Sequence, residues 1–333
     1  FHAEPVGCPA CGPALEFIRG GEVINDSEQA LRACVETLAA GRIVAVKGVG
    51  GYHIMCDARN DDAVTRLRAR KQRPDKPLAV MFPVPPEKPL QQVTRSVCLS
   101  RDQADLLQSP ERPIVLVNRQ PDGGISALVS PGLEEIGIML PYSPLHHLLL
   151  GDFGHPLVAT SGNISGEPVL TGNDSVMERL APVVDAFLHH NRPIARPADD
   201  PVYRYINNQP RPLRRGRGNT PLELELPCTL EQPVIAAGGH MKNAVAIAWD
   251  NRAVISPHIG DLDSARSRAV FEQTIIDLQS LYQVTATAVI CDAHPGYAST
   301  HWARNSGLPV HRVLHHHAHA ATAYDFGASG CPQ

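Results

Sequence analysis

The sequence of 333 residues has few aromatic side chains, no long apolar run and no excess of basic charge. Phe, Trp and Tyr make up only 5% of it and the formal net charge is −4, which argues against a protein whose main task is to coat nucleic acid. A local basic patch is compatible with this charge. The richest apolar runs, such as residues 148–150, fall far short of the ~18 residues of a transmembrane helix, so no membrane partner is expected.

A starting methionine and a signal peptide are also missing. Phe1 opens the chain without a basic segment followed by an apolar one, so we expect a piece cut from a longer protein. The chain has no disulfide framework either. Of the eight cysteines, six are scattered singly, a usage typical of reduced thiols in the cytoplasm, where we expect the protein to reside.

What the sequence does contain predicts a mixed α/β protein of about two domains, with 43% hydrophobic residues to fill their cores. We expect a helix over residues 27–40, capped by Asp26 and stopped by Gly41, followed by a buried strand at 43–46. Asp61 and Asp62 are expected to cap a second helix, and Ser143-Pro144 to open a third. Short strands are expected at 78–82, 114–117, 138–140 and 157–159.

The pattern restarts after a Pro-rich stretch at residues 221–233. Strands are predicted at 234–237, 244–249 and 253–255, and these three are expected to form a meander. A helix over 264–282 is expected to bury Ala265, Phe271, Ile275, Leu278 and Tyr282. Further strands are predicted at 288–291 and 310–314.

Two polar groups in the first half could together hold a triphosphate and its sugar. Lys71-Gln72-Arg73, with Lys76 just after, lies at a helix end and offers positive charge. Residues 160–166, which begin Thr160-Ser161-Gly162-Asn163, offer hydroxyls and an amide at a strand end. Each group also has a plainer interpretation, as a solvated basic helix end and as an ordinary polar turn.

Metal ligands are suggested at both ends of the chain. Cys8 and Cys11, followed by Gly12, form half of a tetrahedral zinc knuckle, or else a chance pair in a loop. His315 and His319 are one helical turn apart if a helix begins near 315, so both imidazoles could bind one zinc or iron ion. The alternative is an exposed run of histidines. Asp292 and His294 are candidates for positioning that site.

Taken in order along the chain, these motifs resemble the HypF family of hydrogenase maturation carbamoyltransferases. The matching stretches are residues 1–13, 47–53, 70–77, 140–147, 160–163, 239–243, 256–262, 291–297 and 315–319. By this resemblance residues 1–19 are the end of a zinc-finger segment and 20–222 a YrdC-like domain that forms carbamoyl-adenylate. Residues 223–232 are then a linker, and 233–333 the N-terminal part of a Kae1-like carbamoyltransferase domain of the actin/Hsp70-like (ASKHA) α/β class.

The resemblance implies a two-step reaction. ATP, with Mg²⁺, and carbamoyl phosphate would give carbamoyl-adenylate, and the carbamoyl group would pass to the C-terminal cysteine of the partner HypE for cyanide ligand synthesis. Lys71 and Arg73 would be catalytic. The nucleotide and adenylate would be bound by these two with Lys47, Lys76, Thr160, Ser161, Asn163 and Arg215. Zinc would bind at Cys8 and Cys11, and zinc or iron at His315 and His319.

The sequence departs from the family in extent and at one motif. The later half of the transferase domain is missing, with its glycine-rich loops and an aspartate expected to complete the metal site, so we expect transfer to be crippled. Residues 214–219 also differ from the family's usual aromatic-containing stretch.

Three rival interpretations remain. A threonylcarbamoyl-adenylate synthase of tRNA modification shares the YrdC-like fold, but it needs neither Cys8 and Cys11 nor a second domain. An antibiotic O-carbamoyltransferase has both domain types in reverse order. A nucleic-acid-binding module could use residues 66–73 and 211–217 as phosphate contacts, against the acidic net charge.

Overall fold

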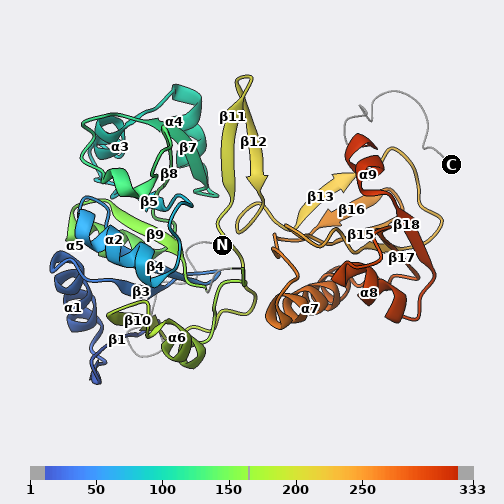
Figure 1. Cartoon of the computed structure of the whole chain (residues 1–333), viewed down its shortest axis with the longest axis horizontal. Helices are drawn as coiled ribbons and strands as arrows, with labels where there is room; N and C mark the ends of the chain where they lie inside the picture. Colours follow the sequence, from blue (N-terminus) through green and yellow to red (C-terminus); the bar gives the residue numbers. More distant parts are fainter. Residues whose placement is uncertain (1–11, 164–165, 322–333) are drawn as a thin grey trace. The chain divides into compact units, whose positions relative to one another are not determined.

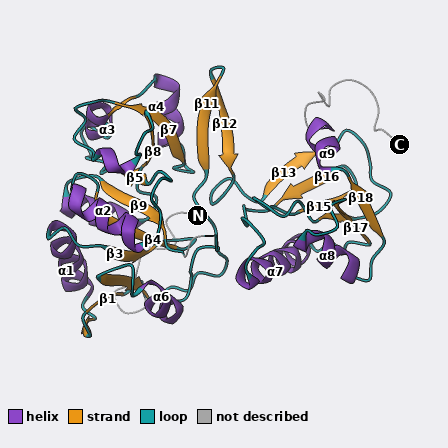
Figure 2. Cartoon of the chain, in the orientation of Figure 1, coloured by secondary structure: helices purple, strands orange, loops and turns teal. Residues whose placement is uncertain are grey.

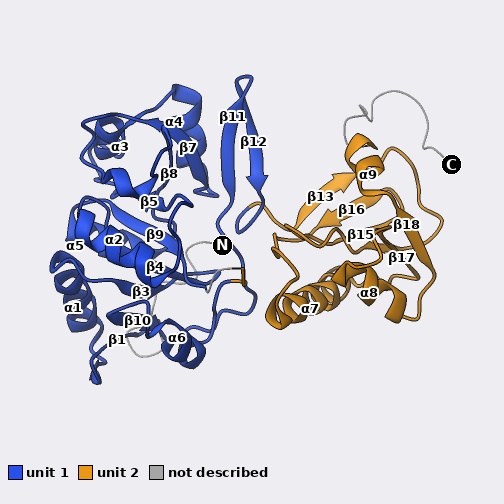
Figure 3. Cartoon of the chain, in the orientation of Figure 1, with its two compact units in different colours: residues 1–165, 169–218 blue, residues 166–168, 219–333 orange. Residues whose placement is uncertain are grey.

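The structure is a computed structural model that describes residues 12–163 and 166–321. These form two compact units, shown in different colours in Figure 3. Unit 1 contains residues 12–163 and 169–218, and unit 2 contains 166–168 and 219–321. Both mix strands and helices (Figure 2), which confirms the predicted α/β class. Within the described residues, none of the helices combines the length and apolarity needed to cross a bilayer.

Unit 1 is built on one mixed sheet, which has 12 strands within the described residues. The strand order is β12-β11-β7-β8-β5-β9-β4-β3-β10-β1-β2, and β6 pairs with β7 (Figure 1). The strands are β1 (Leu15–Arg19), β2 (Glu22–Ile24), β3 (Val44–Lys47), β4 (Tyr52–Asp57), β5 (Ala79–Met81), β6 (Val97–Cys98), β7 (Ile114–Arg119), β8 (Glu135–Met139), β9 (Leu157–Ser161), β10 (Ala186–His190), β11 (Val202–Ile206) and β12 (Gln209–Arg214).

Helices cover both faces of this sheet, because its strands send alternate side chains to opposite sides. In β3, Val44 and Val46 belong to one buried cluster and Ala45 to the other. Residues of α1 and α5 pack in the first cluster, and residues of α2, α3, α4 and α6 in the second. The helices are α1 (Ser27–Ala39), α2 (Asp61–Arg70), α3 (Gln91–Ser96), α4 (Arg101–Gln108), the 3₁₀ helix η1 (Ala127–Val129), α5 (Pro144–Phe153) and α6 (Asn173–Leu180).

Unit 2 has its own sheet, in the order β13-β16-β15-β14-β17-β18 over the residues that the structure describes. Residues of α7 and α8 pack with strand residues in its core. The elements are β13 (Leu222–Glu225), β14 (Val234–Ala236), β15 (Ala246–Trp249), β16 (Arg252–Ile255), α7 (Ala265–Tyr282), β17 (Ala288–Asp292), α8 (Ala298–Asn305), β18 (Val310–Val313) and α9 (His315–Ala321).

Several elements that local sequence signals predicted are present in the structure. Asp26 caps α1, its side chain accepting from the Gln29 amide at 2.9 Å, and Gly41 follows that helix with φ of +71°. Ser143 caps α5, which begins at Pro144. The predicted meander is also confirmed, since β14 pairs with β15 and β15 with β16, both antiparallel.

Three details differ from the expectation. The cap of α2 is Asn60, whose side chain accepts from the Ala63 amide at 3.0 Å, while Asp61 and Asp62 occupy the first turn, where the helix dipole favours acidic groups. In α7 the buried stripe is Ser267, Phe271, Ile275 and Leu278. Ala265 lies two positions from that stripe, off its face, and is exposed, and Tyr282 is only half-buried.

The third detail is the predicted linker, since β13 lies at its start and pairs antiparallel with β16. Alternating Leu and Glu over residues 222–225 has the period of a strand, a signal that the flanking prolines obscure. The structural division therefore falls after Gly218, four residues before the predicted domain end.

Candidate functional site

A cavity of about 200 Å³ opens in unit 1 where the central strand β4 begins and the central strand β9 ends. Tyr52 and His53 of β4 and Thr160 and Ser161 of β9 line it. The antiparallel register of these strands pairs His53 with Ser161 and so fixes which side chains meet there. Loops from three distant parts of the sequence complete the wall, around residue 73, around residue 142 and over residues 198–202.

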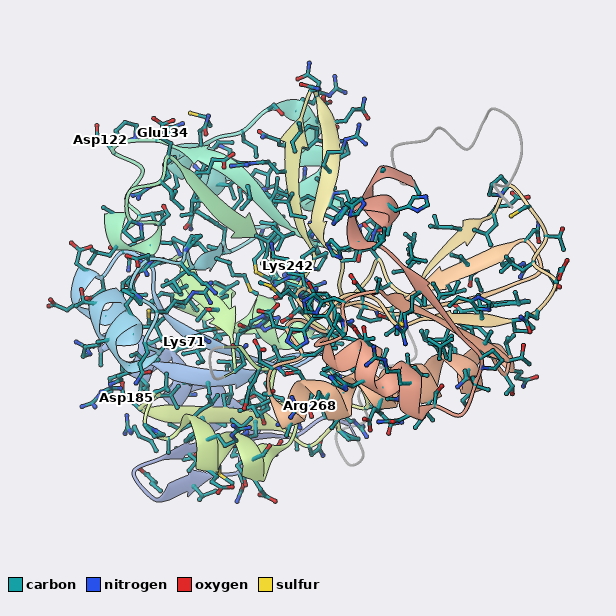
Figure 4. The ribbon with its side chains drawn as sticks, turned by 45° about the vertical axis from the view of Figure 1, so that its right-hand side comes forward. Lys71, Asp122, Glu134, Asp185, Lys242 and Arg268 are labelled. Atoms are coloured by element: carbon teal, nitrogen blue, oxygen red, sulfur yellow. The ribbon has the colours of Figure 1, made fainter. Side chains whose placement is uncertain are left out.

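Lys71 follows the end of α2 and reaches the end of β9 (Figure 4). Its ammonium donates to the carbonyl of Ser161 and to the carbonyl and side-chain oxygens of Asn163, at 3.2 and 3.1 Å. The side chain is buried, and burial together with the neighbouring Arg73 lowers the pKa of Lys71 to about 7. Lys71 thus joins the two polar groups that the sequence singled out.

Arg73 lines the cavity and donates to the carbonyl of Pro77 at 2.9 Å. Its Nε is buried and has no hydrogen-bond partner among the described residues. Burial, then Arg68 and Arg214, lower the pKa of Arg73. Positive groups therefore converge on the cavity, where each destabilises the charged form of the others. An anionic ligand would offset this repulsion.

The turn after β9 depends on a glycine. The Gly162 amide donates to the carbonyl of Tyr52 at 2.6 Å, and a Cβ at position 162 would lie only 2.7 Å from that oxygen. The hydroxyl of Ser161 donates to the Asn163 side chain at 2.8 Å. This close approach of the main chain aligns Ser161 and Asn163 beside Lys71.

Sequence analysis missed the acidic centre of the cavity wall. Asp200 accepts from Arg217 Nε at 2.7 Å, and its other oxygen lies 2.8 Å from His53 Nε2. Burial acts to raise the pKa of Asp200, but His53 and Arg217 outweigh it and hold that pKa well below its ordinary value. The Arg217 guanidinium also covers the ring of Tyr142, 3.1 Å from its centroid.

Two further residues belong to this cluster, His146, which is fully buried, and Arg214, which is half-buried. His146 contacts the Ser143 hydroxyl at 3.0 Å, and burial lowers the pKa of His146 well below its ordinary value, so this imidazole is neutral. Arg214, a cavity residue that sequence analysis singled out only within the basic stretch 211–217, donates to the Asp200 carbonyl at 2.9 Å. The sequence did contain a signal for part of this cluster. The stretches 47–53 and 140–147, which match the family, contain His53, Tyr142 and His146.

The structure places the remaining nucleotide candidates in unit 1 as follows. Thr160 lines the cavity and is buried. Lys47 is buried in a separate polar cluster, where its ammonium donates to Asn173 Oδ1 at 2.7 Å and to the His190 carbonyl at 3.1 Å. The Lys76 side chain is exposed, and Arg215 is half-buried. Neither of these two residues, nor Lys47, is part of the cavity lining.

In unit 2, α9 begins at His315 as expected and brings two imidazoles together. His315 Nε2 and His319 Nε2 lie 3.1 Å apart, and His315 Nδ1 contacts Asp292 at 2.7 Å. Two nitrogen ligands of one tetrahedral zinc ion lie about 3.3 Å apart at ordinary Zn–N distances, so this pair fits as half of a site. Asp292 contacts Nδ1, the ring nitrogen of His315 that does not face His319. In zinc sites a carboxylate commonly contacts the non-ligating nitrogen of a metal-bound histidine in this way.

That pair does not form a complete metal centre within residues 12–163 and 166–321, where no three His, Cys, Asp or Glu side chains are grouped to hold an ion. His294 stacks on Tyr297 with centroids 4.2 Å apart. The loop 238–243 lies beside the pair, since a Cβ on Gly239 would be 3.6 Å from the His315 ring. Cys8 and Cys11 lie outside the described residues.

Comparison with known proteins gives matches to both units. The model of the Sua5–YciO–YrdC family, described as "Telomere recombination", matches residues 36–216, more than half of the chain. The model of the HypF Kae1-like domain matches residues 229–324.

The chain is also similar to curated carbamoyltransferases HypF. It is 44% identical to that of Synechocystis sp. over 90% of this chain and 39% of the relative, and 43% identical to that of Rhodobacter capsulatus over 96% and 43%. It therefore spans about two fifths of the length of these relatives.

Solved structures agree. Full-length HypF in a phosphate- and nucleotide-bound form superposes with a TM-score of 0.89 at 37% identity, over 97% of this chain and 41% of that chain. HypF of T. kodakarensis gives 0.90 at 33% identity, over 97% and 42%. P. abyssi Sua5 complexed with L-threonine, at 15% identity and a TM-score of 0.53, shares the fold.

Proposed function

From the premise that the chain belongs to the Sua5–YciO–YrdC family, and within it to the HypF carbamoyltransferases, we propose that unit 1 binds ATP and forms carbamoyl-adenylate. The observation that carries this proposal is the cationic cavity. Arg73 lines it together with Ser161, Lys71 binds the Ser161–Asn163 turn beside it, and Arg73 Nε has no partner among the described residues. The solved HypF in a phosphate- and nucleotide-bound form supports the same ligand class.

The proposed reaction starts from carbamate, which hydrolysis of carbamoyl phosphate supplies together with inorganic phosphate. A carboxylate oxygen of carbamate attacks the α-phosphorus of ATP, a new P–O bond forms, and the bond to the β-phosphate breaks to release pyrophosphate. Negative charge grows on the phosphates during this displacement. Lys71 and Arg73 stabilise that charge, because fixed cations in a water-poor site act more strongly than in bulk solvent. Mg²⁺ would accompany the triphosphate.

Lys47, Lys76 and Arg215 do not line the cavity, so their support as nucleotide ligands is weaker than that of Arg73, Thr160 and Ser161, which do. Thr160 and Ser161, with Asn163 next to them on the turn that Lys71 binds, remain in the proposal as hydrogen-bonding groups for the nucleotide. Arg214 joins them as a further cation at the cavity.

Substrate choice is tested by the adenylate that forms. We expect the 333-residue chain to exchange labelled pyrophosphate into ATP when given carbamoyl phosphate or ammonium carbamate, and mass spectrometry to find carbamoyl-adenylate. L-threonine with bicarbonate should give neither signal. Detection of threonylcarbamoyl-adenylate would instead assign the chain to the tRNA-modification branch of the fold.

The pKa of Lys71 predicts proton uptake when ATP binds. With a pKa of about 7, the Lys71 amine is mostly neutral at pH 8, and a bound triphosphate would raise that pKa toward its ordinary value of ~10.4. Binding at pH 8 should therefore take up close to one proton, and binding at pH 6 far less. Calorimetry in two buffers of different ionisation enthalpy measures the uptake, and Lys71→Met should abolish it. Equal uptake in the variant would contradict this role of Lys71.

For unit 2 we propose transfer of the carbamoyl group toward the C-terminal cysteine of HypE for cyanide ligand synthesis in hydrogenase maturation. The match to the HypF Kae1-like domain supports it. His315 and His319 would hold zinc or iron, which would supply a Lewis acid to polarise the carbamoyl carbonyl. Asp292 holds the His315 ring in one orientation. Among the described residues these donors form only half of a site.

A zinc titration tests that half-site. Two imidazoles bind a divalent ion only modestly, so we expect weak zinc binding that falls at least about tenfold in His315→Ala and in His319→Ala. His317→Ala is the matched control, since position 317 lies on another face of α9. Calorimetry in a Cys8→Ser, Cys11→Ser background separates this signal from the cysteine pair. Unchanged affinity in both alanine variants would reduce the cluster to a solvated histidine run.

A further inference from the structure

Arg68, on the buried face of α2, is an arginine that the reaction proposed above does not use. It is 8% exposed, and each of its five hydrogen bonds goes to a main-chain carbonyl. Two of those carbonyls belong to η1, on Leu128 and on Val129, the latter at 3.1 Å. A buried cation held this way costs desolvation, so its retention calls for a specific role.

The other three carbonyls belong to the loop that follows the helix. Arg68 Nη1 donates to the carbonyls of Arg73 at 2.8 Å, Pro74 at 2.9 Å and Lys76 at 3.2 Å. The chain can turn back over the helix end because Gln72 adopts a left-handed conformation with φ of +51°. One guanidinium thus binds η1 and the loop 73–76 together.

Arg73 is held by Arg68 at both ends of its main chain. Its amide donates to the Arg68 carbonyl at 3.0 Å, and its carbonyl accepts from the Arg68 side chain. The Arg73 side chain then extends to the cavity wall. The main-chain atoms from which this side chain extends are therefore held by Arg68.

We propose that Arg68 is a positioning residue for Arg73, holding the loop 73–76 so that the Arg73 guanidinium faces the phosphates of ATP. The inference rests on the proposed adenylation for its functional consequence. A lysine cannot replace Arg68, because one ammonium offers its donors from a single point, whereas the carbonyls of η1 and of the loop lie around a planar fork. Arg68 touches no substrate and acts through Arg73.

A double-mutant cycle separates positioning from general stability. We expect Arg68→Met to lower ATP–pyrophosphate exchange roughly 10-fold or more, since displacing a catalytic group by ~1 Å can cost up to 10²-fold. In an Arg73→Ala background the same substitution should have almost no further effect. Arg68→Lys should stay closer to Arg68→Met than to the unmodified chain. Equal losses in both backgrounds, or no loss in either, would overturn the proposal.

The matched control is Arg66→Met on the same helix. Arg66 also donates to a main-chain carbonyl, that of Gly41, which is remote in sequence from the loop. This variant should keep exchange within about twofold of the unmodified chain. All variants are assayed below the onset of thermal unfolding, which is recorded for each.

Hydrogen exchange of the ligand-free chain tests the same contact without any activity. Arg68→Met should speed amide exchange in residues 72–77 at least about tenfold, and Arg66→Met should not. If the unmodified chain neither binds Mg-ATP nor supports pyrophosphate exchange, the proposed function fails while this measurement still decides whether Arg68 holds the loop. Unaltered exchange in residues 72–77 refutes the role of Arg68 and leaves the proposed function standing.

Discussion

Arg73→Ala and Lys71→Ala are each expected to lower carbamate-dependent ATP–pyrophosphate exchange by about 10- to 150-fold. A charge-assisted hydrogen bond contributes ~1.5–3 kcal/mol, and every 1.36 kcal/mol corresponds to a factor of ten. The two losses should differ in kind. Arg73 lines the cavity and its Nε has no hydrogen-bond partner among the residues that the structure describes, whereas Lys71 also ties the Ser161–Asn163 turn to the end of α2. Lys71→Ala should therefore additionally weaken the contacts of that turn.

Arg70→Ala is the matched control for both variants. Arg70 ends the same helix but pairs with Asp185 at 2.8 Å, and neither residue lines the cavity. Its exchange rate should stay within about twofold of the unmodified chain, because a surface ion pair contributes ~0–1 kcal/mol. Unchanged rates in Arg73→Ala and Lys71→Ala would remove the assignment of this cavity as the adenylation site.

Asp200→Ala is expected to lower the free energy of unfolding of unit 1 by about 3–5 kcal/mol. The substitution leaves the buried Arg217 guanidinium without its carboxylate and removes the partner of His53. Glu135→Ala is the control, because the Glu135–Arg204 pair is far more exposed and should cost no more than ~1 kcal/mol.

Urea unfolding can assign the loss to unit 1. Both tryptophans of the chain, Trp249 and Trp302, belong to unit 2, so their fluorescence follows that unit while far-ultraviolet circular dichroism follows both. We expect Asp200→Ala to move the dichroism transition and leave the tryptophan transition in place. The reverse pattern would contradict the structural role of Asp200.

Acidic pH should reduce the difference in the free energy of unfolding between Asp200→Ala and the unmodified chain. The pKa of Asp200 is lowered in the folded state, so the folded protein binds fewer protons than the unfolded chain at acidic pH. The stabilisation that ionised Asp200 contributes is complete above the ordinary carboxyl pKa of ~3.9 and is lost as the pH falls toward the lowered pKa. Unfolding curves at pH 7 and at about pH 3 check this sign.

The candidate site was predicted only in part, and there is a physical reason why some of its residues were predicted and others were not. Lys71 with Arg73, and Ser161 with Asn163, are short-range motifs whose residue types carry phosphate chemistry by themselves. Asp200 gave no such signal, and Arg214 and Arg217 stood out only as part of the basic stretch 211–217, because an aspartate or an arginine in a basic loop is common on any surface. Their roles follow from contacts with His53 and Tyr142, which are distant in the sequence.

By itself the sequence determined the local elements and their order. Helix caps at Asp26 and Ser143, the meander from Val234 and the start of α9 at His315 depend on neighbouring residues, whose propensities and hydrogen bonds act over a few positions. The order of the motifs was enough to indicate the family. Such signals are local, so they can be recognised without knowing how the chain folds back on itself.

Only the tertiary structure decided which of those elements meet. The pairing of β4 with β9 brings His53 to Ser161, and the fold then adds Asp200 and Arg217 beside them. The same packing leaves the Lys47 and Lys76 side chains out of the cavity and buries Arg68 among carbonyls of two segments. Long-range contacts of this kind arise from sheet register and side-chain packing, which no short stretch of sequence encodes.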